Sequence, residues 1–117
     1  MKVKYLDLKN KRVFISGGGS GIGATIVEHF CEQNSEVYFI DIDIKASKEL
    51  IKNIKQKKLR TPNFIECNIL DIKKLQNTIQ EIINKKGPIH CLINSAANDD
   101  RHNTEQVDEK YWENRMG

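Results

Sequence analysis

Short apolar runs alternate with amphipathic stretches along this chain, and that alternation limits the possible folds more than any other feature. Runs of this length, rich in Val, Ile, Phe and Tyr, predict strands that are buried on both faces. The four predicted strands are residues 13–16, 36–41, 63–68 and 89–94. Strands that alternate with helices predict an α/β fold whose parallel sheet is covered by helices on both faces.

Three stretches between the predicted strands carry apolar residues at helical spacing, so that each has one apolar face. The apolar positions are Ile22, Ile26, Val27 and Phe30 in the first stretch, Ala46, Leu50, Ile51 and Ile54 in the second, and Ile72, Leu75, Ile79, Ile82 and Ile83 in the third. Asn34 is a suitable left-handed stop for the first helix. We expect Asp71 to cap the third helix, Gly87–Pro88 to end it, and a further short helix to begin near Asp108.

Composition excludes several classes of protein. The 117 residues fit one domain, and 19 Lys and Arg against 16 Asp and Glu give a net charge of +3, too small and dispersed to predict a nucleic-acid partner. No apolar run approaches the ~18 residues of a membrane span, and the first residues lead into no signal-peptide core. Cys31, Cys67 and Cys91 form no CxxC pair and no metal-ligand spacing with the histidines. We therefore expect a single cytoplasmic domain over residues 1–117 with reduced thiols, no metal and no membrane contact.

A glycine-rich segment lies between the first predicted strand and the first predicted helix. Its sequence is Ser16-Gly17-Gly18-Gly19-Ser20-Gly21-Ile22-Gly23. Glycines at this position allow a sharp turn, a close approach of the backbone to a diphosphate, and close packing of helix on strand. The free amides at the helix start would face the phosphates, aided by the helix dipole. The segment therefore predicts a dinucleotide site.

Asp41 ends the second predicted strand. A carboxylate at this position can accept hydrogen bonds from an adenosine ribose, and it would repel a 2′-phosphate. Ser20, Ile42 and Asp43 supply no cation that would offset this repulsion. The sequence therefore favours NAD over NADP, although Asp41 capping a turn remains an alternative.

These motifs resemble those of the short-chain dehydrogenase/reductase family. The glycine segment resembles the family's TGxxxGxG with Ser16 in place of Thr, Asn94-Ser95-Ala96-Ala97 resembles its NNAG, and Asn68-Ile69 resembles its Asp-Val pair after strand three. The resemblance implies a partial Rossmann-type doubly wound sheet of about four strands in the order 3-2-1-4. The cofactor-binding residues that it implies are Gly17, Ser20, Gly21, Ile22, Gly23, Asp41, Asn68, Ile69, Asn94 and Ala96. Asn68 would meet the adenine amino group through its amide oxygen, and Ile69 would pack on the ring.

The resemblance also implies a reaction, the transfer of a hydride between nicotinamide and an alcohol or carbonyl substrate. The segment Asn98-Asp99-Asp100-Arg101-His102 resembles one in members that act on sugars or sugar acids. The family's catalytic Tyr-x-x-x-Lys matches this sequence only at Tyr5 and Lys9, before the first strand, which we interpret as chance. A phenol without a neighbouring cation has a pKa of about 10, unsuited to proton transfer at neutral pH. We therefore expect no catalytic residue here, and an inactive chain truncated before the catalytic part.

Four strands would leave the fourth as an open edge, because the doubly wound fold uses about six strands. We expect self-association through this edge, or a partner that supplies a complementary C-terminal half. Two other interpretations stay open. One is a non-catalytic NAD-binding or interaction module, or an inert truncated remnant. The other is an S-adenosylmethionine methyltransferase, against which the glycine spacing and the segment Asn94–Ala97 argue.

Overall fold

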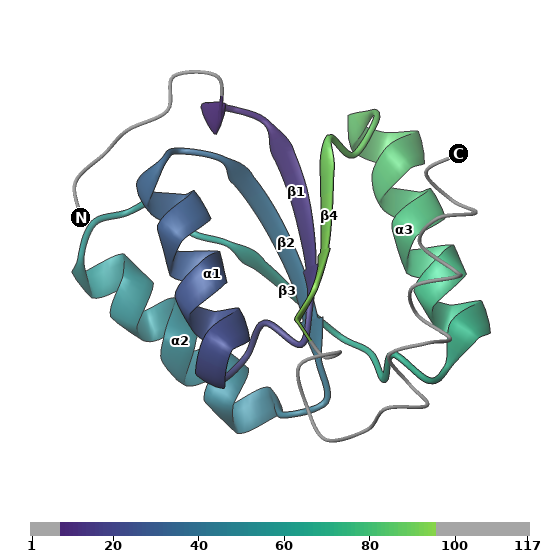
Figure 1. Ribbon diagram of the computed structural model, residues 1–117, viewed down its shortest axis with the longest axis horizontal. Coiled ribbons are helices and arrows are strands. Elements are labelled where there is room, and N and C mark those ends of the chain that lie inside the picture. The colour runs from purple at the N-terminus through teal and green to yellow at the C-terminus, as the bar shows by residue number, and fades with distance from the viewer. Residues whose placement is uncertain (1–7, 96–117) are drawn as a thin grey trace.

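Strands and helices alternate along residues 8–95, the part of the chain that the computed structural model describes (Figure 1). The elements are β1 (Arg12–Ser16), α1 (Gly21–Glu32), β2 (Glu36–Asp41), α2 (Ile44–Gln56), β3 (Asn63–Glu66), α3 (Ile72–Lys86) and β4 (Cys91–Asn94). Every strand pair is parallel and the sheet order is β3-β2-β1-β4, which confirms the predicted α/β fold and its 3-2-1-4 order. The short helix expected near Asp108 lies outside the described residues.

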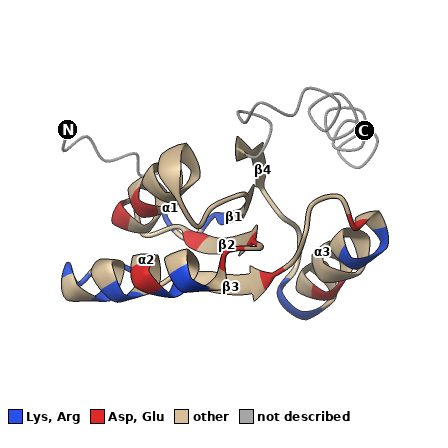
Figure 2. Ribbon diagram, turned by 90° about the horizontal axis from the view of Figure 1, so that it is seen from below, with Lys and Arg blue, Asp and Glu red and all other residues tan. Residues whose placement is uncertain are grey.

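Each face of the sheet has its own hydrophobic cluster, because alternate residues of a strand point to opposite faces. Val13 and Ile15 of β1 pack on the side covered by α1 and α2, whereas Phe14 packs on the side covered by α3. Figures 1 and 2 show α3 across the sheet from α1 and α2. The helices therefore cover both faces, as the continuous apolar strands predict.

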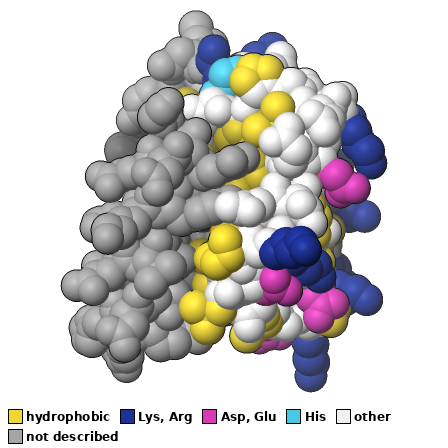
Figure 3. Space-filling model, turned by 90° about the vertical axis from the view of Figure 1, so that its right-hand side faces the viewer, with side chains coloured by type: hydrophobic (Ala, Val, Ile, Leu, Met, Phe, Trp, Pro, Cys, Tyr) yellow, Lys and Arg dark blue, Asp and Glu magenta, His cyan; other side chains and the backbone are white. Residues whose placement is uncertain are grey.

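The predicted helix ends are confirmed where the structure tests them. The Asp71 carboxylate accepts a hydrogen bond from the backbone N–H of Lys74 at 3.2 Å and caps α3. Asn34, which follows α1, has a φ of 65°, and Gly87, which follows α3, has a φ of 107°. Asn34 therefore stops α1 in the left-handed region, and Gly87 ends α3 with a positive φ that favours glycine. The side of the molecule that Figure 3 shows carries Lys, Arg, Asp and Glu interspersed. Within residues 8–95, none of the helices has the length and apolar composition needed to cross a membrane.

Two predicted strands are longer than those observed. β3 ends at Glu66 rather than at residue 68, because the chain then turns and the backbone N–H of Asp71 donates to the Asn68 carbonyl at 2.9 Å. β4 begins at Cys91 rather than at residue 89. Just before it, the His90 ring nitrogen Nδ1, rather than a backbone carbonyl, accepts from the Arg12 N–H at 2.8 Å. A side chain thus replaces one bond of the strand ladder.

The expected apolar face of α1 is wrong at Ile22, whose side chain is 62% exposed. The buried residues of this helix are Gly23, Val27 and Cys31, spaced four apart. Gly23 contacts the glycine turn, and this contact determines which face of α1 is buried. Ile22 is one position away from Gly23, about 100° around the helix, and therefore points outward.

Candidate functional site

Because the strands are parallel, the carboxyl ends of all four strands of the described sheet lie at the same end of the sheet. The glycine turn follows β1, Asp41 ends β2, Asn68 lies in the loop after β3, and Asn94 ends β4. In open α/β sheets the carboxyl ends of the strands border the ligand crevice. The structure therefore gathers the described members of the predicted cofactor-binding set at one end of the sheet.

The glycine turn begins in a conformation that favours glycine. Gly17 has a φ of 69°, and the N–H groups of Gly17 and Gly18 both donate to the Ile40 carbonyl, at 2.8 and 3.2 Å. A Cβ atom on Gly23 would lie 1.9 Å from the Gly17 carbonyl oxygen. Turn and helix are thus in direct backbone contact, and no side chain fits between them.

The first turn of α1 offers backbone donors that nothing in residues 8–95 accepts. Ser20 occupies the N-cap position, but its side chain makes no capping hydrogen bond there. The amides of Gly21, Ile22 and Gly23 likewise have no acceptor within the described part of the chain. A Cβ atom on Gly21 would meet no described atom within 4 Å, so the space beside Gly21 is open. Such a helix start, with its positive dipole end, binds anions.

Asp41 is half-buried, and each of its carboxylate oxygens already accepts a backbone amide. Oδ2 accepts from the Gly19 N–H and Oδ1 from the Asp43 N–H, both at 2.8 Å. Asp41 therefore does cap a turn, and it also holds the glycine segment. A carboxylate has about four acceptor positions, so the two amides leave capacity for ribose hydroxyl groups.

The loop after β3 places its two predicted residues differently. Asn68 is exposed, but its Oδ1, the atom expected to meet adenine, accepts from the Leu70 N–H at 2.9 Å. Ile69 is partly buried against the cluster under α3. Ile42 and Leu70 at the same edge are 59% and 56% exposed. The prediction omitted these two apolar residues, although their positions in the loops that follow β2 and β3 could have indicated them.

The end of β4 is bonded to the start of the glycine turn. The Ser16 hydroxyl donates to Asn94 Oδ1 at 2.6 Å, so the Asn94 amide nitrogen keeps both of its hydrogens for other partners. Ser95 donates from its hydroxyl to backbone carbonyls of the same turn. Ala96, the last residue of the predicted set, lies outside the described residues.

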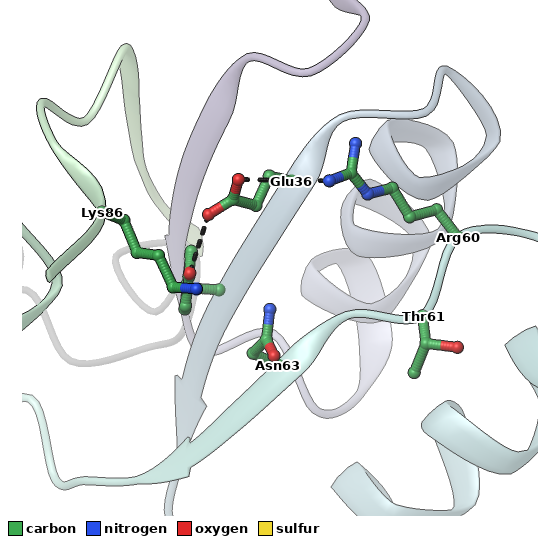
Figure 4. Close-up of a pocket in the computed structure, with 6 residues that line it drawn as sticks. Glu36, Arg60, Thr61, Asn63 and Lys86 are labelled. Carbon is green, nitrogen blue, oxygen red and sulfur yellow. Dashed lines mark hydrogen bonds and ion pairs between the residues drawn. The ribbon is translucent and has the colours of Figure 1, made fainter.

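A hollow of about 340 Å³ lies toward the opposite end of the sheet, by the amino ends of β2 and β3 (Figure 4). It is lined by Glu36, Tyr38, Arg60, Thr61, Asn63 and Lys86. The Glu36 carboxylate accepts from Arg12 Nε at 2.9 Å and from the Tyr38 hydroxyl at 2.7 Å, and it lies 4.0 Å from Arg60. The Arg12 hydrogen bond lowers the pKa of Glu36, and burial raises the pKa of Tyr38 to about 12. These groups satisfy one another's hydrogen bonds and charges, which indicates a structural role. The hollow is therefore the weaker candidate site.

Residues 8–95 bring together no group of three His, Cys, Asp or Glu side chains that could hold a metal ion. The groups that the described site offers a ligand are backbone amides, the Asp41 carboxylate and side-chain hydroxyl groups. It can hold an anion at α1 and hydroxyl groups at Asp41.

Comparisons with known proteins identify relatives of this chain. A family model described as short chain dehydrogenase matches residues 11–117. The protein "Probable galactose dehydrogenase GalD" of Rhizobium meliloti (strain 1021) is 34% identical over 113 residues, which are 97% of this chain and 44% of that protein. D-xylose 1-dehydrogenase of Caulobacter vibrioides is 37% identical over 112 residues, 96% of this chain and 43% of that protein. This chain therefore spans less than half the length of these relatives.

Solved structures show the same fold. An oxidoreductase from Haemophilus influenza, crystallised with bound NAD, superposes with a TM-score of 0.62 at 19% identity, over 73% of this chain and 30% of that one. Because the family match covers residues 11–117, the chain belongs to the short-chain dehydrogenase family.

Proposed function

We propose that this chain is the NAD(H)-binding part of a short-chain oxidoreductase that transfers a hydride between nicotinamide and an alcohol or carbonyl group of a sugar-like substrate. The observation that carries the proposal is that the amides of Gly21, Ile22 and Gly23, beside the left-handed turn at Gly17, find no acceptor among residues 8–95. Family membership and the related oxidoreductase with bound NAD support a nicotinamide cofactor. The relatives named for galactose and D-xylose support a sugar-like substrate for the whole protein.

The described residues fit such a cofactor. The amides of Gly21, Ile22 and Gly23 would hold the diphosphate, and Asp41 would hold the adenosine ribose. When bound, the cofactor supplies the nicotinamide ring that accepts or donates the hydride. Asp41 supports NAD over NADP, because the described residues place no ion pair on its carboxylate that would offset a 2′-phosphate.

We further propose that the chain by itself binds the dinucleotide without turning over substrate. The 117 residues contain no Tyr-x-x-x-Lys after β4, so they lack the family's proton-transfer pair. The residues described here would bind and orient the dinucleotide, and the proton transfer would need groups from elsewhere.

A charge substitution at Gly21 tests the diphosphate site. Gly21→Asp and Gly21→Asn add side chains of nearly equal size to an open position, and both residues tolerate its φ of 59°. Only Asp adds a negative charge beside the diphosphate. Calorimetric titration with NAD should show affinity reduced about tenfold or more by Asp relative to Asn. Equal affinities for the two variants would place the diphosphate elsewhere.

The unmodified chain should bind NAD saturably, bind NADP more weakly, and show no turnover with galactose or D-xylose. Turnover would contradict the proposed inactivity of the chain. Absence of binding to both nucleotides would instead favour an inert remnant. Binding of S-adenosylmethionine without NAD would favour a methyltransferase.

The partner that we propose is a strand added to the outer edge of β4. Within the described sheet β4 pairs only with β1, through residues 91–94. Either a second copy or a complementary C-terminal half would pair there. Light scattering should detect an assembly larger than one chain, and a strict monomer at every concentration would exclude self-association.

A further inference from the structure

We propose that Ser95 is a positioning residue for the dinucleotide, because its hydroxyl holds the backbone carbonyls from which the glycine turn begins. The inference rests on the proposed function, since it concerns the same site. It extends that function to a buried side chain outside the predicted cofactor-binding set. Through the turn, Ser95 sets the position of the amides at the start of α1.

The Ser95 hydroxyl lies at the point where strand becomes turn. Its Oγ is 2.6 Å from the Ser16 carbonyl oxygen and 2.9 Å from that of Gly17, and the residue is only 6% exposed. Ser16 is the last residue of β1, whereas Gly17 has a φ of 69°. The hydroxyl has a single proton, which it gives to one carbonyl or shares between both. It therefore restrains both carbonyl groups at the point where the backbone changes direction.

The Gly17 carbonyl transmits this restraint to α1. A Cβ atom on Gly23 would lie 1.9 Å from the Gly17 oxygen and 2.6 Å from Ser95 Oγ, so the three groups are in mutual contact. A rotation of the Gly17 carbonyl would therefore displace the first turn of α1. That turn carries the amides proposed to hold the diphosphate, whose hydrogen bonds are lost when their direction changes.

A second bond links the same two strand ends. The Ser16 hydroxyl donates to Asn94 Oδ1 at 2.6 Å, one residue before Ser95. The last residue of β4 and the residue after it thus both hold the last residue of β1. The chain that follows β4 is in this way coupled to the diphosphate-binding turn.

Ser35 provides a matched control. It is buried like Ser95, and its hydroxyl donates to the Leu8 carbonyl at 2.7 Å. Ser35 directly precedes β2, at the end of the sheet opposite the glycine turn. Ser35→Ala therefore removes the same kind of hydrogen bond without touching the site.

The test compares two ligands, ADP-ribose, which contains the diphosphate, and adenosine, which lacks it. Ser95→Ala should raise the Kd for ADP-ribose about fivefold and change that for adenosine less than about twofold, as the loss of a positioning hydrogen bond predicts. Ser35→Ala should change neither Kd. NMR titration of the whole chain measures the Kd values of both ligands. In the same samples, hydrogen exchange of the Gly17 and Gly18 amides should speed up in Ser95→Ala alone.

Ser95→Cys replaces the hydroxyl with a weaker donor on a larger sulfur atom, and serves the same comparison if the Ala variant does not fold. An unchanged ratio of the two Kd values, with ADP-ribose still bound by the unmodified chain, would overturn the role of Ser95 alone. Failure of the unmodified chain to bind ADP-ribose would overturn the proposed function and this inference together.

Discussion

Replacing Gly23 with Ala tests whether α1 packs directly on the glycine turn. The added Cβ would lie 1.9 Å from the Gly17 carbonyl oxygen, 2.8 Å from its carbonyl carbon and 2.6 Å from Ser95 Oγ. Favourable separations between such atoms are about 3.5 Å. Two of the three neighbours are backbone atoms, so no rotation of a side chain can relieve the contact.

The expected cost follows from these contacts. Overpacking costs about 1–3 kcal/mol where side chains can yield, so a backbone collision should cost about 3 kcal/mol. Ala favours a helix over Gly by about 1 kcal/mol, which leaves a net loss near 2 kcal/mol. Total free energies of unfolding are about 5–15 kcal/mol, so this loss is large. The midpoint of thermal unfolding should fall by about 10 °C.

Gly21→Ala is the control, because it adds the same methyl group two residues away. No described atom lies within 4 Å of its Cβ, and the cost is only the left-handed φ of 59°, about 1 kcal/mol. Urea unfolding followed by circular dichroism compares the two variants. Equal losses of unfolding free energy, or a smaller loss in Gly23→Ala, would refute the direct contact between turn and helix.

Three further predictions concern single side chains. Asp41→Ala should weaken NAD binding and relax discrimination against NADP, because the ribose acceptor is lost; unchanged affinity and selectivity in calorimetry would remove Asp41 from the site. The Arg12 hydrogen bond holds the pKa of Glu36 below its ordinary 4.5, so Glu36 stabilises the fold fully above that pH and progressively less below it. Glu36→Gln should flatten the acid side of a stability–pH curve, and an unaltered curve would contradict the pairing. Burial raises the pKa of Cys31 to about 12, so iodoacetamide should label half-buried Cys91 before Cys31. Mass spectrometry that found Cys31 labelled first would show that its thiol is accessible.

Local chemistry made several elements predictable. The limits of β2 agree with the prediction because Asn34 stops the helix before it and Asp43 caps the helix after it. Asp71 and Gly87 likewise bracket α3. In each case the deciding groups lie within a few residues of the element that they end, so the sequence alone contains them.

Long-range contacts decided the features that the prediction missed. The start of β4 depends on the His90 ring accepting from Arg12, and the outward direction of Ile22 depends on Gly23 meeting Gly17. Ser47 is a further case, since its buried hydroxyl has no partner among residues 8–95 and would lie 2.4 Å from a Cβ on Gly19. A helical pattern cannot show that such a serine faces the glycine segment.

The sequence by itself determined the order of the elements, the glycine turn, and the residue types at the carboxyl ends of the strands. These follow from periodicity and from short motifs, whose interactions are local. Only the tertiary structure decided that Asp41 holds the glycine segment and that Ser95 bonds the carbonyls of Ser16 and Gly17. Residues so far apart in the chain become neighbours only when parallel strands pair, and the direction of each side chain then depends on that packing.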